Sequence, residues 1–137
     1  MNIKVDWKDN LKFNAQGESG HDIPMDASES AGGDDSAARP MEMLLAGLGG
    51  CTSIDVVLIL NKMKAEIEDF NVEIEAERED EHPKRFKKIH LKYYIKGKNL
   101  EERKVEKAIN LSEDKYCSAS ASLNAEITSS YEIENIE

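Results

Sequence analysis

The sequence predicts an α+β protein in which antiparallel sheets wrap one long, central, buried helix. Two patterns lead to this class. Six stretches of the chain alternate apolar and polar residues with a period of two, which is typical of half-buried strands. Residues 43–60 are instead apolar on nearly every side, which is typical of a helix without a solvent-exposed face. Strands and helices that follow one another in runs favour α+β with antiparallel sheet.

The length of the chain indicates how many domains it forms, and its net charge argues against some classes of partner. The 137 residues, 39% hydrophobic and 34% charged, suit a single domain over residues 1–137 with one core. A net charge of −10 argues against nucleic acid as the main partner and against an anionic membrane surface. The first ten residues have no apolar secretory segment, so we expect a cytoplasmic protein.

The first 25 residues predict a small antiparallel meander of three strands. The apolar members of the alternation are Ile3, Val5, Trp7, Leu11, Phe13, Ala15, Ile23 and Met25. Asp9-Asn10 and residues 16–20 provide the turns between them. Residues 26–38 are rich in small and polar side chains without periodicity, which indicates a loop.

A long helix is predicted to start at Pro40, a residue favoured in the first helical turn, with Glu42 placed well for the helix dipole. Residues 43–60 barely reach the ~18 apolar residues of a membrane span. Asp55 and three glycines favour a core helix instead. In so short a chain, this helix is either wrapped by sheet or shared with another subunit. We therefore expect an obligate dimer.

The second half of the chain predicts a hairpin, a helix and a final strand. Residues 70–76 and 89–95 alternate as strand partners, with the acids of the first strand facing Lys88 and Lys92 of the second. Asn99 resembles the cap of a helix over residues 100–111. A weakly helical stretch over 117–124 precedes the last strand at 127–133.

Cys51 follows Gly49-Gly50 inside the apolar run, and two interpretations of these glycines stay open. They can interrupt the helix, so that Cys51 starts a new segment whose free N–H groups stabilise a thiolate. They can instead allow close backbone packing around an inert thiol. Nine helical residues turn through about 900°, so Glu42 reaches Cys51 only through a kink or a second subunit.

Two further residues bear on the chemistry of this segment. Asp55 lies on the same helical face as Cys51, where an ionised carboxylate would raise the thiol pKa. Alternatively, it bonds to a neighbouring backbone group or to Ser53. Cys117 follows Ser112 and opens a short helix. One helical cysteine is more often a packing residue, but two that each follow a helix breaker favour a pair.

The residues around both cysteines resemble a known family. Pro40-x-Glu42-Met43-Leu44-Leu45-Ala46-x-Leu48-Gly49-Gly50-Cys51, followed by Ser53-x-Asp55-Val56-Val57, resembles the first cysteine motif of the OsmC/Ohr family. That family contains osmotically inducible and organic hydroperoxide resistance proteins. Leu111-Ser112-x-x-Lys115-Tyr116-Cys117-Ser118 resembles its second motif. The similarity extends over nearly the whole chain and points to the YhfA-like branch rather than to Ohr proper.

The resemblance implies an OsmC-like, intertwined homodimer with thiol peroxidase activity in oxidative stress defence. Cys51 would attack an organic hydroperoxide, and Cys117 would resolve the sulfenic acid as a disulfide. A dithiol of the lipoyl type would then restore both thiols. The resemblance implies no metal, haem or flavin cofactor.

The catalytic residues implied by the resemblance do not all match. In Ohr proper, an arginine from the N-terminal strands and a glutamate directly after the proline clamp the reactive thiolate. Here Met41 follows Pro40, Glu42 is displaced by one, and no arginine precedes Arg39. Lys8, Lys12 or Arg39 would have to take the place of the missing arginine, and Arg39 is preferred because it directly precedes the motif. We therefore take Cys51, Cys117, Glu42 and Arg39 as candidate catalytic residues.

The alternative to a peroxidase is a dimeric binding module that senses redox state and has an apolar interface pocket. A cysteine hydrolase would need His21 near Cys51.

Overall fold

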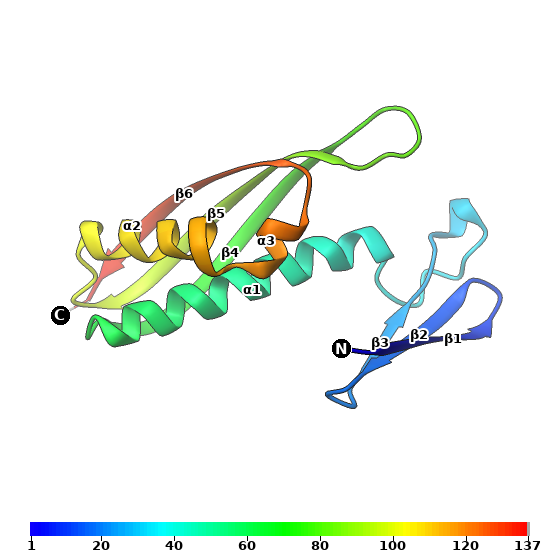
Figure 1. Cartoon of the computed structure of the whole chain (residues 1–137), viewed down its shortest axis with the longest axis horizontal. Coiled ribbons are helices and arrows are strands. Elements are labelled where there is room, and N and C mark those ends of the chain that lie inside the picture. The colour runs from blue at the N-terminus through cyan, green and yellow to red at the C-terminus, as the bar shows by residue number, and fades with distance from the viewer. Residues whose placement is uncertain (137) are drawn as a thin grey trace. The chain divides into compact units, whose positions relative to one another are not determined.

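The computed structural model describes residues 1–136. The chain divides into two compact units, Met1–Ala46 and Gly47–Glu137. The long helix α1 (Pro40–Lys62) begins in the first unit and continues into the second. Figure 1 shows the elements of each unit along the chain. The expectation of a single domain over residues 1–137 stays a prediction.

The first unit contains the predicted meander. The strands β1 (Ile3–Asp9), β2 (Lys12–Gly17) and β3 (Asp22–Met25) pair antiparallel in that order. The loop that follows contains a short 3₁₀ helix, η1 (Glu29–Ala31). Three apolar side chains of β1 remain exposed although their alternation predicts a half-buried strand: Ile3, Val5 and Trp7.

The second unit is a three-stranded sheet with the order β4 (Glu66–Arg78), β5 (Phe86–Lys98), β6 (Glu126–Asn135). The hairpin of β4 and β5 has the predicted register, with Glu73 opposite Lys92 and Glu77 opposite Lys88. The strand β6 pairs with β5 in parallel, so the expectation of purely antiparallel sheets is wrong at this point. A parallel neighbour requires a long crossover, which the helical segment between β5 and β6 provides. The α+β class is confirmed.

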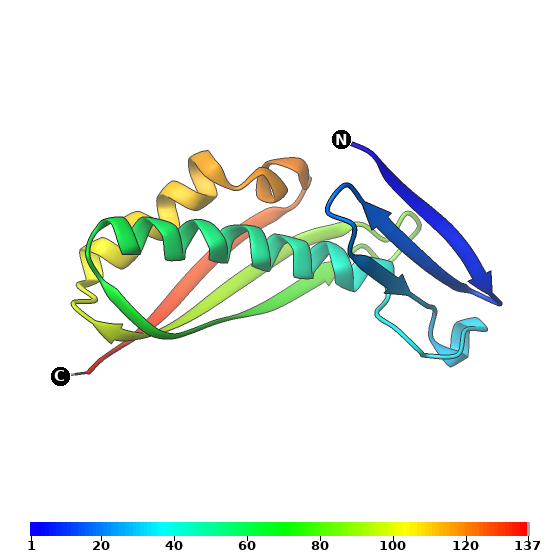
Figure 2. The ribbon, with the colours of Figure 1, turned by 90° about the horizontal axis from the view of Figure 1, so that it is seen from below.

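The core of the second unit lies between this sheet and its helices. Alternate residues of β5 are buried: Ile89, Leu91, Tyr93 and Ile95. The second part of α1 and α2 (Glu102–Leu111) lie on the same face of the sheet, as Figures 1 and 2 show. The other face is charged, and the Lys92 ammonium there pairs with Glu132 at 3.3 Å. One face of the sheet is therefore packed against the helices, and the other face is exposed to solvent.

The helix α1 is long and apolar enough to cross a membrane by length and composition alone. Leu48, Val56 and Leu60 are fully buried, as expected of a core helix. Ile54 and Leu58, however, are 63% and 54% exposed in the single chain. The expectation of a helix buried on all sides within one chain is thus wrong, because a single sheet covers only one helix face. The other arrangement, a helix shared with a second subunit, stays a prediction.

The start of α2 also differs from the expectation. Its N-cap is Glu101, which makes no side-chain capping bond. Asn99 instead has a positive φ of 59°, and its side chain donates a hydrogen bond to the Lys64 carbonyl at 3.2 Å. Asn99 thus fixes the turn between β5 and α2, because asparagine tolerates the left-handed conformation.

The loop over residues 26–38 is organised around the buried Asp26 carboxylate. This carboxylate accepts hydrogen bonds from the backbone of Ala27, Asp34 and Ser36, and from the Ser36 hydroxyl at 2.7 Å. The Ser36 hydroxyl, more than any other partner, lowers the pKa of Asp26 to about 2. Donors that favour the ionised form stabilise the folded loop whenever Asp26 is charged.

We predict that Asp26→Ala lowers the thermal midpoint at neutral pH, whereas Asp9→Ala at an exposed position leaves it nearly unchanged. Because the folded pKa lies below the unfolded value of about 3.9, the contribution is present above pH ~4. It disappears as the pH falls through about 2. Thermal melts of wild type and variants between pH 7 and pH 2 measure this difference. A gap in midpoint that stayed constant down to pH 2 would contradict the assignment.

Candidate functional site

Cys51 lies in the middle of α1, which runs without interruption through Gly49 and Gly50. The interpretation that these glycines break the helix is therefore wrong. A Cβ on Gly49 would lie 2.7 Å from Cδ1 of Ile74 on β4. Close backbone packing is thus confirmed at Gly49, which lets the helix approach the sheet, whereas the inertness of the Cys51 thiol stays a prediction. The Cys51 side chain itself is half-buried.

Cys117 caps the N-terminus of α3 (Ser118–Ser122), so the prediction that it opens a short helix is confirmed. Its sulfur accepts a hydrogen bond from the Ser120 amide at 3.3 Å. The residue is only 3% exposed. A π-helical turn, η2 (Ser112–Tyr116), joins it to α2 and directs Cys117 back towards α1.

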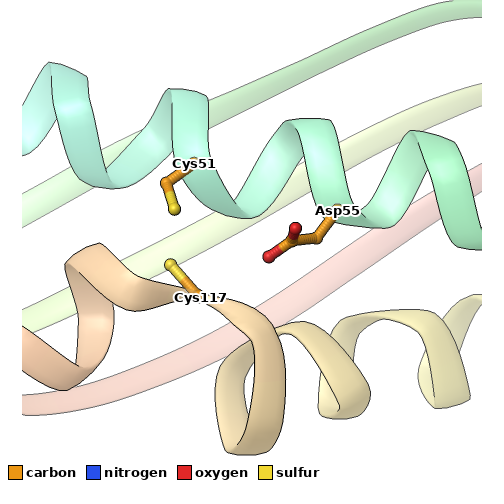
Figure 3. Close-up of side chains that lie close together, drawn as sticks. All are labelled: Cys51, Asp55 and Cys117. Carbon is orange, nitrogen blue, oxygen red and sulfur yellow. The ribbon is translucent and has the colours of Figure 1, made fainter.

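The two sulfurs and the Asp55 carboxylate form one cluster. The sulfurs of Cys51 and Cys117 and a carboxylate oxygen of Asp55 all lie within 4.8 Å of one another. Figure 3 shows the three side chains pointing towards one another, two from α1 and one from the start of α3. Both cysteines are free thiols. An S–S bond of about 2.05 Å requires the sulfurs to approach by less than about 3 Å.

The two thiols differ in environment. Burial, together with smaller effects of the neighbouring Cys51 and Asp55, raises the pKa of the Cys117 thiol to about 11, although the hydrogen bond from the Ser120 amide acts to lower it. Cys117 is therefore protonated at neutral pH and is a poor first nucleophile. Cys51, which is more accessible, is the sulfur that a reagent from solvent meets first.

Asp55 is held by a residue that is distant in sequence. The Ser112 hydroxyl donates to its carboxylate at 3.0 Å, so the partner of Asp55 is Ser112 rather than the suggested neighbour Ser53. Ser112 also bonds to the buried Thr52 hydroxyl at 2.8 Å. The Thr52 hydroxyl bonds in turn to Tyr93 of β5, again at 2.8 Å. Sequence reasoning missed these hydroxyls, although a threonine within an apolar helix is a signal for a buried polar link.

Arg39 and Glu42 belong to the first unit, where their contacts are local. The Arg39 guanidinium pairs with Asp35 at 2.7 Å and donates to the Ala37 carbonyl at 3.0 Å. The Glu42 carboxylate accepts the Arg39 backbone N–H at 3.0 Å at the start of α1. These contacts stabilise the helix N-terminus. A catalytic role for either residue stays a prediction.

As potential metal ligands, Cys51, Cys117 and Asp55 offer two sulfurs and one oxygen. A closed structural zinc site normally takes four protein ligands, so this cluster supplies one too few. Two facing free thiols with an adjacent carboxylate suit thiol–disulfide exchange instead. The arrangement can form and break a disulfide without a bound cofactor.

The sequence comparisons agree with this geometry. A family model described as "OsmC-like protein" matches residues 33–132. The "Protein YhfA" of Escherichia coli strain K12 is 39% identical over 135 residues, covering 97% of this chain and 98% of the relative.

Solved structures share the fold over almost the whole length. A hypothetical protein from Aquifex aeolicus VF5 is 29% identical with a TM-score of 0.80, covering 98% of this chain and 97% of that one. The organic hydroperoxide resistance protein OhrB of Bacillus subtilis is 17% identical with a TM-score of 0.62, covering 96% and 98%. At this identity the second likeness shows the fold alone.

We predict that alkylation separates the two thiols. Iodoacetamide at pH 7 should modify Cys51 well before Cys117, because each pH unit below the pKa lowers the thiolate fraction about tenfold. Labelling of Cys117 should rise steeply as the pH approaches about 11. Mass spectrometry of the two cysteine peptides over time measures both rates. Equal labelling at pH 7 would contradict the buried, protonated state of Cys117.

Proposed function

Because this chain belongs to the OsmC-like protein family, we propose that it is a thiol-dependent peroxidase that reduces organic hydroperoxides. Cys51 is the proposed peroxidatic residue and Cys117 the resolving residue. The observation that carries the proposal is the approach of the two free sulfurs to within 4.8 Å. Two cysteines so distant in sequence and so close in space are typical of a redox pair.

The proposed cycle has three steps. The Cys51 thiolate attacks the distal oxygen of the hydroperoxide, an S–O bond forms, and the O–O bond breaks. The departing alkoxide takes up a proton and leaves as an alcohol, and Cys51 is left as a sulfenic acid. The Cys117 sulfur then displaces the sulfenic oxygen as water and closes the disulfide. A dithiol of the lipoyl type reduces this disulfide by exchange and is itself oxidised.

The name of one structural neighbour supports this choice of substrate. OhrB of Bacillus subtilis is named an organic hydroperoxide resistance protein. We extend that role to this chain as part of the proposal, with oxidative stress defence as its setting. The half-buried position of Cys51 among apolar residues of α1 suits a hydroperoxide with an apolar substituent.

Arg39 and Glu42 are the proposed activators of Cys51. A guanidinium beside the sulfur would favour the thiolate, and a carboxylate would orient that guanidinium. The present contacts of Arg39 are with Asp35 and Ala37. In the proposal Arg39 exchanges these partners when the reactive site is assembled.

A second candidate function rests on the charges in the cluster. The side chain beside the two sulfurs is acidic, and Asp55 and Cys51 both raise the pKa of Cys117. A cluster without a cation within it would give a slow peroxidase. The corresponding alternative is a non-enzymatic dimeric module that binds an apolar ligand and senses redox state through the same disulfide.

Turnover with hydroperoxide separates the two functions. We predict that the wild type consumes cumene hydroperoxide with dihydrolipoamide as reductant, and that Cys51→Ser abolishes the activity. Cys117→Ser should stop multiple turnover with the dithiol, since the disulfide cannot form. Ser53→Ala on the same helix serves as the matched control and should stay active. Absence of turnover in the wild type, with ligand binding unaffected by Cys51→Ser, would favour the binding module.

The homodimer is also part of the proposal. The α1 side chains Ile54 and Leu58 are one turn apart and largely exposed in the single chain. The β1 side chains Ile3, Val5 and Trp7 are exposed as well. Apolar surface of this kind on a soluble protein usually marks an interface. A two-fold partner would cover the free face of α1 with the same face of a second copy.

We predict that the wild type sediments as a dimer and that Leu58→Glu shifts it towards the monomer. A carboxylate at an apolar interface is desolvated without a partner, and the dimer is destabilised accordingly. The control is Lys62→Glu, one turn further along the exposed end of α1, which should remain dimeric. Sedimentation velocity over a range of concentrations measures the equilibrium. A wild type that is monomeric at every concentration would contradict this part of the proposal.

A further inference from the structure

A row of buried hydroxyl groups connects the cysteine cluster with a second carboxyl group. The row starts at Asp55 beside the two sulfurs and ends at Glu113 in η2. Its members, in order, are Ser112, Thr52 and Tyr93. The links measure 3.0, 2.8 and 2.8 Å, and the last, from Tyr93 to Glu113, is 3.5 Å. All three hydroxyl-bearing residues are fully buried.

The number of protons in this row is limited, because each hydroxyl has a single proton to donate. When Asp55 is ionised, Ser112 donates to it, and the other hydroxyls each donate towards Ser112. No hydroxyl proton of the row is then left for the Glu113 oxygen that faces Tyr93, so Glu113 must donate its own proton there, while the Ser129 hydroxyl outside the row donates to its other oxygen at 3.2 Å. When Asp55 is protonated, all three hydroxyls reverse, and Tyr93 donates to an ionised Glu113. The row therefore accommodates one proton shared between two carboxyl groups.

We propose that Asp55 accepts the proton of the Cys117 thiol as the two cysteines join, and that the hydroxyl row passes this proton on to Glu113 once Glu113 has released its own proton to solvent. The proposal rests on the disulfide step of the proposed function. It adds a catalytic proton acceptor and an exit path that neither the family motif nor the sequence indicated.

The closing step balances with this acceptor. The Cys117 S–H bond breaks and its proton moves to Asp55, while the sulfur electron pair forms a bond to the Cys51 sulfur. The S–O bond of the Cys51 sulfenic acid breaks, and its electron pair leaves with oxygen as hydroxide. Hydroxide takes up one proton from solvent and becomes water, which balances the proton that leaves to solvent through Glu113. Cys117 is oxidised, the sulfenic sulfur is reduced, and no net proton is gained or lost.

Cys117 needs such an acceptor because it is buried and protonated at neutral pH. Glu113 suits the other end of the row, because burial raises its pKa against the hydrogen bonds from Ser129 and Tyr93. Glu113 is only half-buried, so it can release its own proton to solvent and then take up the one that the row delivers.

An aromatic disulfide such as dithiobis-nitrobenzoate tests the proposal without any hydroperoxide. Attack by Cys51 releases one coloured thiolate and leaves a mixed disulfide on Cys51. Attack by Cys117 then releases a second coloured thiolate, and its proton is left behind in the cluster. Stopped-flow absorbance of the reduced, full-length protein separates the two phases, and Cys117→Ser identifies the second. The result is independent of whether the protein is a peroxidase.

We expect Asp55→Asn to slow the second phase by about 100-fold, the usual scale of a lost acid–base group. The first phase should be unchanged or faster. A purely electrostatic effect has the opposite sign, since removal of the Asp55 charge would lower the pKa of Cys117 and accelerate closure. A second phase that is equal or faster in Asp55→Asn overturns the proposal. So does a wild type that releases no second thiolate.

The exit path is tested by Tyr93→Phe, which removes one hydroxyl from the row, with Tyr94→Phe on the charged face of the sheet as the matched control. We expect several-fold slower closure in Tyr93→Phe and no change in Tyr94→Phe. Glu113→Gln should slow closure as well, which keeps the test valid if Tyr93→Phe folds poorly. Closure at the wild-type rate in Glu113→Gln overturns the path to Glu113.

Discussion

The buried hydroxyl of Thr52 holds together the three segments on which the cysteine site depends. From the middle of α1 it reaches Tyr93 of β5 and Ser112 at the start of η2, each at 2.8 Å. A buried hydroxyl without partners is costly, so this register of helix against sheet is favoured over its neighbours. Because Cys51 adjoins Thr52 and Cys117 ends the turn that Ser112 begins, the same link brings the two sulfurs together.

The two thiols lie in different environments, and each environment suits a different step of the proposed cycle. Cys51 is accessible and lies on a rigid helix, whereas Cys117 is buried, protonated and held by the Ser120 amide. A half-buried nucleophile that reacts first and a more deeply buried partner that reacts second are the parts that a two-cysteine cycle requires. Burial is the main cause of the raised pKa of Cys117, Asp55 adds to it, and the Asp55 carboxylate is the proposed acceptor of the Cys117 proton.

Local patterns in the sequence predicted most elements, and long-range pairing explains what they missed. Period-two alternation predicted the strands of both units, and the apolar run predicted α1. The parallel pairing of β6 depends on where the crossover returns, and the exposed Ile54 and Leu58 depend on how much one sheet can cover. The proximity of Cys51 and Cys117 came from the family resemblance, whereas the Asp55–Ser112 bond joins distant residues that no spacing relates.

The central claim is that folding pairs Cys51 with Cys117 for oxidation. The most direct measurement treats the reduced protein with one equivalent of cumene hydroperoxide, blocks free thiols, and maps the cysteine peptides by mass spectrometry. We predict a single product in which the Cys51 and Cys117 peptides of one chain are joined by a disulfide. Both cysteines recovered as blocked thiols, or Cys51 oxidised beyond the sulfenic acid with Cys117 free, would contradict the claim.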